Sequence, residues 1–105
     1  MKTSPSNELA IEASEIKNTA ILLRAIEHPL RQKILHFISS NEQVFVTKVH
    51  TRFKIEQSVA SDHLGILRDA KLVVANRKGR FIYYSVNREE INRLHQLLEN
   101  LNIDY

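Results

Sequence analysis

The sequence predicts a mainly α-helical domain with a small β-hairpin. Apolar residues recur at spacings of three and four over most of the chain, and two β-rich runs flank a polar turn near residue 79. The 105 residues are 43% hydrophobic and 26% charged, as in an ordinary globular protein. Two halves of this chain would each be too small to bury a core. We therefore expect a disordered tail over 1–7 and a single domain over 8–105.

The first two helices are predicted from their apolar stripes. From Leu9 to Glu27 apolar residues recur every three or four positions, which is the pattern of a helical face. His28 precedes a proline and therefore avoids the helical conformation, while Pro29 suits the first turn of a new helix. This second helix is expected to end at Ser39. Its inward face is expected to contain Leu30, Ile34, Leu35 and Ile38.

A short strand and two short helices are predicted next. The run from Val44 to Val46 is apolar and rich in β-branched residues, which favours a strand. Thr47 is expected to cap a third helix that ends at Phe53. A fourth helix is expected over 57–70, after a tight connection. Two short helices separated by a few residues are a helix-turn-helix candidate.

The β-hairpin and a last helix complete the predicted domain. Strands are expected over 72–75 and 81–86, joined by a polar turn over 76–80. The last helix is expected over 88–101, where apolar residues again recur at helical spacing. This order of elements is that of a winged helix-turn-helix domain, with five helices and a wing of two or three strands.

Positive charge is concentrated in the middle of the chain. Residues 48–88 contain nine basic and three acidic residues, a net charge of +6, whereas the rest of the chain carries −3. A polyanion is therefore expected to approach the helix-turn-helix and the hairpin. Three basic residues around the hairpin turn also repel one another, and a phosphate backbone would relieve that repulsion.

The candidate DNA-binding residues follow from this order and charge. In a winged helix-turn-helix domain the second helix of the pair enters the major groove while the hairpin contacts the backbone. Gln57 can pair with adenine through two hydrogen bonds, and Asp62 can accept one from cytosine. The alternative is that these residues only form the solvated face of an amphipathic helix. The predicted DNA-binding residues are Lys48, Lys54, Gln57, Ser58, Ser61, Asp62, His63, Arg77, Lys78 and Arg80.

The two terminal helices predict a homodimer. Their apolar stripes exceed what one small domain can cover, and large exposed apolar patches usually mark interfaces. The alternative is that both stripes pack inside one protomer. The predicted interface residues are Leu9, Ile16, Ala20, Leu23, Ile91, Leu94, Leu98 and Leu101.

Four linked segments resemble the ArsR-type (ArsR/SmtB) winged-helix transcriptional repressors. Residues 25–35 resemble the family's signature at the junction of its first two helices, and residues 57–64 resemble its recognition helix. Residues 67–73 resemble the exit into the wing, and Gly79-Arg80 followed by Tyr83-Tyr84 resembles the wing itself. The resemblance implies a homodimeric repressor that binds a near-palindromic operator in double-stranded DNA.

The family's metal sites are not matched by this sequence. Many members bind metals through a cysteine pair at the start of the third helix, where this chain has Phe45 and Thr47. A second family site uses carboxylates and histidines of the last helix. The matching positions hold Arg88, Glu90, Leu101 and Asp104. A site built from Glu90, His95 and Glu99 is an alternative to an exposed, solvated cluster, but we expect no metal and no cofactor.

Composition argues against several other functions. The chain has no cysteine, which excludes disulfides, thiolate metal sites and thiol chemistry. It contains two glycines and no nucleophile motif, so we do not expect an enzyme. No apolar run approaches the ~18 residues that span a bilayer, and the first ten residues contain no apolar run. We therefore expect a cytoplasmic protein without membrane contact. The alternative to DNA is a winged helix that contacts an acidic protein partner.

Overall fold

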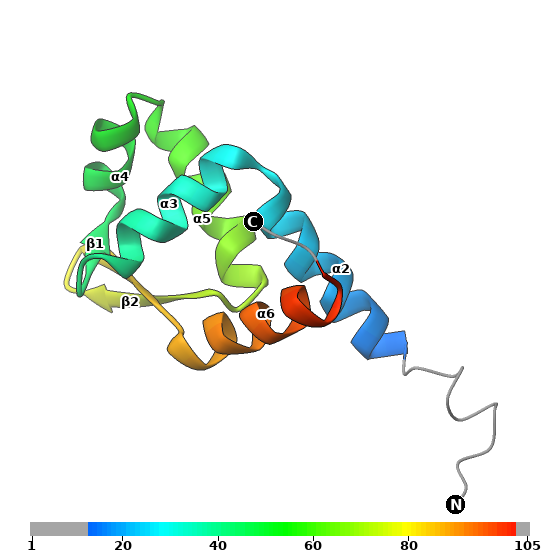
Figure 1. The fold of residues 1–105 in the computed structure, drawn as a ribbon. Coiled ribbons are helices and arrows are strands. Elements are labelled where there is room, and N and C mark those ends of the chain that lie inside the picture. Colours follow the sequence, from blue (N-terminus) through cyan, green and yellow to red (C-terminus); the bar gives the residue numbers. More distant parts are fainter. Residues whose placement is uncertain (1–12, 103–105) are drawn as a thin grey trace, which may run out of the picture.

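The computed structural model describes residues 13–102 and confirms the expected winged helix-turn-helix fold class (Figure 1). The predicted tail over 1–7, the predicted helix start at Leu9 and the position of Asp104 lie outside the described residues. The described elements are, in chain order, α2 (Ala13–Glu27), α3 (Pro29–Ser39), β1 (Val44–Phe45), α4 (Val46–Phe53), α5 (Gln57–Asp69), β2 (Val73–Lys78), β3 (Phe81–Val86) and α6 (Arg88–Asn100).

The sheet has three antiparallel strands with β3 in the centre, in the order β1-β3-β2. The pairing of β2 with β3 continues to Lys78 opposite Phe81, so only Gly79 and Arg80 connect the two strands. The expected turn over 76–80 is therefore wrong, because the polar residues 76–78 still pair with β3. Gly79 has a φ of 64°, which glycine adopts without the steric cost that a Cβ imposes.

Several predicted helix ends differ from the structure by one or two residues. The cap expected at Thr47 is wrong, because α4 already begins at Val46 and its N-cap is Phe45, whose side chain makes no capping hydrogen bond. Only two residues of β1 pair with β3, so the chain enters the helix directly after Phe45. Ala70 and Leu101 are the C-cap residues of α5 and α6 rather than members of those helices.

The core lies where α3, α5 and the sheet meet. Ile34 and Ile38 of α3 are fully buried, as predicted, and Leu30 and Leu35 are partly buried against the same cluster. The buried hydrophobic residues are Leu22, Ala25, Ile26, Ile34, Ile38, Val44, Val49, Ala60, Leu64, Leu67, Ala70, Leu72, Val73, Tyr84, Leu94 and Leu98. The last two place one face of α6 inside the protomer.

The junction between α2 and α3 is fastened by two side chains of α3. The last carbonyls of a helix lack partners within the helix and need other donors. The guanidinium of Arg31 donates to the carbonyl of Ala25 at 3.0 Å and to that of Arg24 at 2.8 Å. The amide of Gln32 donates to the carbonyl of Ile26 at 2.6 Å. These bonds fix the direction in which α3 leaves α2.

Candidate nucleic-acid interface

The first turns of α5 present a polar surface to solvent. Gln57, Ser58, Ser61 and Asp62 are all exposed, as expected for residues that contact DNA. On the opposite side of the helix Ala60, Leu64 and Leu67 are buried in the core. The helix is therefore held on one face while its amide, hydroxyl and carboxylate groups stay free to meet base edges.

A cleft of about 380 Å³ separates this helix from the wing. Gln57 and Ser61 line one side, Arg80 and Phe81 line the other, and Thr47 lies at the start of α4. Hydroxyl, amide and guanidinium groups thus lie on both sides of a cleft between a helix and a β-hairpin, whose lining also includes Phe45, Val46, Ile82 and Tyr84. Such groups are the ones that hold sugar-phosphate backbone while a neighbouring helix reads bases.

The wing carries three exposed cations on and beside its two-residue loop. Arg77 donates to the carbonyl of Gly79 at 3.5 Å, and the ammonium of Lys78 lies 5.3 Å from the ring centroid of Tyr83. The side chain of Arg80 lines the cleft. Because strand pairing extends to Lys78, these charges lie on a stiff hairpin rather than in a loose loop.

The predicted DNA-binding cations have no carboxylate partner among residues 13–102. The ion pairs of this part of the chain join Arg68 to Asp69 and Arg93 to Glu90. All five predicted cations are exposed: Lys48, Lys54, Arg77, Lys78 and Arg80. Lys54 is the left-handed C-cap of α4, so it lies in the turn between the two helices. This surface keeps its positive charge available for a polyanion.

The side chain of His63 points in a different direction from those of the other predicted DNA-binding residues on α5. Its ring packs against the ring of His28, with the centroids 4.8 Å apart, and its Nδ1 lies 3.3 Å from Nη1 of Arg31. It is only partly exposed. Burial, together with the neighbouring His28 and Arg31, lowers the pKa of His63, against an opposing effect of Asp62. The side chain therefore faces the α2–α3 junction rather than the open face of α5.

The predicted dimer residues fall into two groups. Leu94 and Leu98 are buried within the protomer, and Leu23 and Ile91 are partly buried against the same core. Ile16 is 57% exposed and Leu101 is 48% exposed, while Ala20 is also exposed. Leu9 lies outside the described residues. The exposed apolar part of the prediction is therefore limited to the outer face of α2 and the end of α6.

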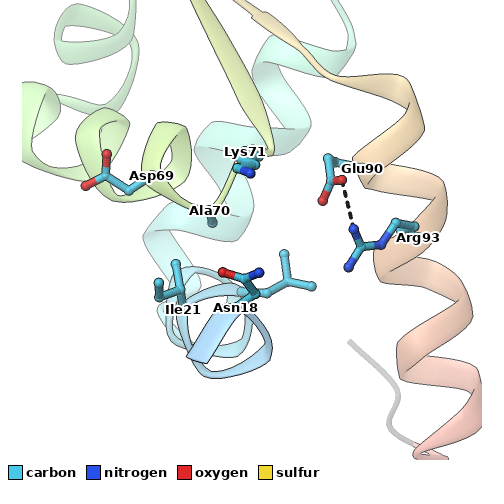
Figure 2. A pocket seen from close by; sticks show the side chains of 8 residues that line it. Asn18, Ile21, Asp69, Ala70, Lys71, Glu90 and Arg93 are labelled. Carbon is cyan, nitrogen blue, oxygen red and sulfur yellow. Dashed lines mark hydrogen bonds and ion pairs between the residues drawn. The ribbon is translucent and has the colours of Figure 1, made fainter. Parts of the chain in front are cut away.

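The described residues contain no group of three or more histidine, aspartate or glutamate side chains that could hold a metal. Glu90 instead pairs with Arg93 at 3.2 Å beside a pocket between α2 and α6 (Figure 2). The pocket has a volume of about 60 Å³, which can hold a few water molecules, and the end of α5 also lines it. None of the helices within residues 13–102 is both long and apolar enough to cross a bilayer.

Two features of the site are absent from the sequence-based prediction. Arg31 is 8% exposed and contacts His63 of α5, although a basic residue was not expected inside. Its spacing from Ile34 and Ile38, three and seven positions, puts it on the buried stripe of α3, which is the signal that would have found it. The second feature is an aromatic contact between Phe45 and both Phe81 and Tyr83, which braces the wing against β1.

Comparisons with known proteins agree with this geometry. A family model described as a helix-turn-helix domain matches residues 26–74. The transcriptional repressor PagR of Bacillus anthracis is 34% identical over 88 residues, which cover 84% of this chain and 88% of PagR. The arsenical resistance operon repressor of Bacillus subtilis is 34% identical over 71 residues, 68% of each chain.

Solved structures show the same fold. The crystal structure of PagR superposes with a TM-score of 0.66 at 33% identity, covering 83% of this chain and 99% of that one. The solution structure of a homodimeric winged helix-turn-helix DNA-binding domain from Mycobacterium bovis superposes with a TM-score of 0.72. At 22% identity, over 97% of this chain and 88% of that one, the second likeness concerns the fold alone.

Proposed function

This chain belongs to the ArsR-type helix-turn-helix family of transcriptional regulators, and we propose that it is a homodimeric repressor of the cytoplasm that binds a near-palindromic DNA operator. In this proposal α5 enters the major groove, where Gln57, Ser58, Ser61 and Asp62 meet base edges. The wing contacts the backbone through Arg77, Lys78 and Arg80. Lys48 and Lys54 add backbone contacts from α4 and the turn behind it.

The observation that carries the proposal is the pairing of two exposed surfaces across one cleft. Gln57 and Ser61 of the exposed polar face of α5 and Arg80 of the wing line the same concave surface of about 380 Å³. Winged helices bind duplex DNA with a helix in the major groove and a neighbouring hairpin against the phosphate backbone. The relatives support repression, since PagR and the arsenical operon protein are both named as repressors.

The homodimer rests on a second observation. Ile16 and Leu101 are about half exposed in the single protomer, and Ala20, one helical turn after Ile16, is exposed as well. An apolar surface of this kind is better covered by a second copy than by water. A two-fold dimer presents two copies of α5, which is why the operator is proposed to be near-palindromic.

The test is a fluorescence-anisotropy titration of the purified chain against its own upstream promoter duplex and a scrambled duplex of equal length, each at two salt concentrations. We expect tighter binding to the promoter, with a preference that persists at the higher salt, because base contacts depend less on salt than phosphate contacts do. Equal affinity for the two duplexes at both salt concentrations would contradict the proposal.

A further inference from the structure

Arg31 is the buried charged side chain of residues 13–102, and it contacts two helices besides its own. From its place on α3 it donates to the carbonyls of Ala25 and Arg24 at the end of α2. The remaining nitrogen, Nη1, lies 3.3 Å from Nδ1 of His63 on α5. One guanidinium thus joins the fixed α2–α3 junction to the helix that is proposed to enter the major groove.

The chemistry of this contact fixes the state of His63. A guanidinium only donates hydrogen bonds, so Nδ1 of His63 must accept one, and a nitrogen that accepts carries no proton. His63 is therefore neutral in this arrangement, with its proton on Nε2. Protonation would remove the acceptor and place a second positive charge against Arg31, at a distance where like charges repel.

The groups around His63 influence whether its ring is neutral or protonated. The ring of His28, at the start of α3, lies with its centroid 4.8 Å away, and its own Nδ1 accepts a hydrogen bond from the backbone of Leu30 at 3.1 Å. Asp62 on α5 favours the charged form of His63, whereas burial, His28 and Arg31 oppose it. Around Arg31, burial and Arg24 lower the pKa of the guanidinium and Glu27 raises it, but arginine stays charged.

We propose that Arg31 and His63 are positioning residues that hold α5 against the α2–α3 junction, and that protonation of His63 releases this hold and weakens operator recognition. The inference rests on the proposed function for its DNA readout. The orientation of α5 relative to the protomer determines where Gln57 and Ser61 fall in the groove. A loosened α5 would keep the basic surface, and with it non-specific binding, while losing part of the preference among sequences.

Two substitutions distinguish the loss of the hydrogen-bond acceptor at residue 63 from the loss of its ability to take up a proton. His63→Gln keeps an oxygen that can accept from Arg31 but has no proton to gain, and His63→Leu removes the acceptor at similar size. At pH 8 we expect His63→Gln to keep more of the wild-type preference for the promoter over the scrambled duplex than His63→Leu does. His63→Leu is expected to lose about tenfold of that preference, the effect of one hydrogen bond to a charged group. Between pH 8 and 5.5 the wild type should approach His63→Leu, while His63→Gln stays constant.

The matched control is His95→Gln, which changes an exposed histidine of α6 and should keep the pH profile of the wild type. The proposal is overturned if His63→Leu keeps the wild-type preference at pH 8, or if His63→Gln loses preference with falling pH as the wild type does.

Measurements on the free protein test the contact between Arg31 and His63 without DNA. Nitrogen-15 NMR of the imidazole rings should show His63 as the Nε2–H tautomer, with a pKa below the ordinary histidine value of about 6.5. Hydrogen exchange of the α5 amides should be faster in His63→Leu than in His63→Gln. An Nδ1–H tautomer, or equal exchange in the two variants, would overturn the inference. If the wild type bound neither duplex while these results held, the proposed function alone would fail.

Discussion

The proposed DNA-binding side of this protein and the outer faces of α2 and α6 are both exposed, but they differ in charge. The wing carries Arg77, Lys78 and Arg80 with no carboxylate partner among the described residues, so it repels another copy of itself. At the other surface Ile16 is 57% exposed and Leu101 is 48% exposed, so apolar area meets solvent in the single protomer. The free energy of the charged surface should fall when it binds a polyanion, and that of the apolar surface should fall when it packs against another apolar surface.

This difference teaches that the two surfaces respond to different changes in conditions. Binding by the wing should weaken steeply with salt, because neutralised phosphates release their counterions. Association through α2 and α6 should depend little on salt, because it rests on the removal of apolar area from water. Substitutions can therefore break one surface while leaving the other intact.

The largest expected effect is on the apolar surface. Replacing Ile16 and Leu101 together by Asp should give a monomer, because two carboxylates would have to be desolvated at the interface. Loss of the second binding unit should weaken promoter binding by about 100-fold, the scale of a lost bivalent contact. Light scattering after gel filtration measures the first effect, and anisotropy measures the second.

Its control adds the same two charges elsewhere. Gln43→Glu with Thr51→Glu changes exposed positions in the loop before β1 and on α4. This variant should remain dimeric. A dimeric Ile16→Asp, Leu101→Asp double variant would refute the assigned interface.

The next effect concerns the wing. Replacing Arg77 and Lys78 together by Ala should weaken binding to promoter and scrambled duplexes alike, on the order of 30-fold, and flatten the salt dependence by about 1.8 in log–log slope. Lys33→Ala with Arg93→Ala removes the same charge from outside the wing and α5, and should change both quantities less. Selective loss of promoter binding alone would contradict a backbone role for the wing.

A smaller effect is expected from Gln57→Ala. If Gln57 reads a base edge, its removal should reduce the preference for promoter over scrambled duplex by about tenfold or less, with little change in the salt slope. Gln96→Ala on α6 is the matched control, because Gln96 is equally exposed but far along the chain from α5. The wing and helix assignments would be wrong if Gln57→Ala and the wing variant behaved alike.

The smallest effect is on stability and belongs to neither surface. The pKa of His63 is lowered in the folded chain by burial and by its neighbours His28 and Arg31. Between that value and the unfolded value of about 6.5, the unfolded chain binds a proton that the folded chain does not, so the free energy of unfolding falls as pH falls through this interval. Urea unfolding at a series of pH values should show this loss in the wild type and in His95→Gln, but not in His63→Gln.

Much of the fold was predictable because local patterns determine it. The apolar spacing of α3, the proline that begins it and the polar exposed face of α5 are all present in the sequence, and the structure has them at the expected residues. The length of the hairpin was not predictable in this way. Asn76, Arg77 and Lys78 have the composition of a turn, and only their pairing with β3 makes them a strand.

In the candidate site, too, local sequence patterns predict exposure but not contacts between distant residues. Exposure of Gln57 and Ser61 follows from helical periodicity, but the direction of His63 depends on Arg31, which is 32 positions away in the chain. Likewise, the helical spacing of Leu94 and Leu98 indicates a buried face without showing what buries it. In the structure that face packs inside the protomer, which leaves Ile16 and Leu101 as the exposed members of the predicted interface.

The pairing of β1 with β3 has a consequence for the order in which the protein folds. Val44 lies opposite Tyr84, so this contact closes a loop of about 40 residues, whereas the helix-turn-helix between them forms through near neighbours. Long loops cost entropy before their contacts repay it, and structures with distant contacts fold more slowly. The helices and the β2–β3 hairpin should therefore form first, and β1 should pair with β3 late, on a scaffold that already exists.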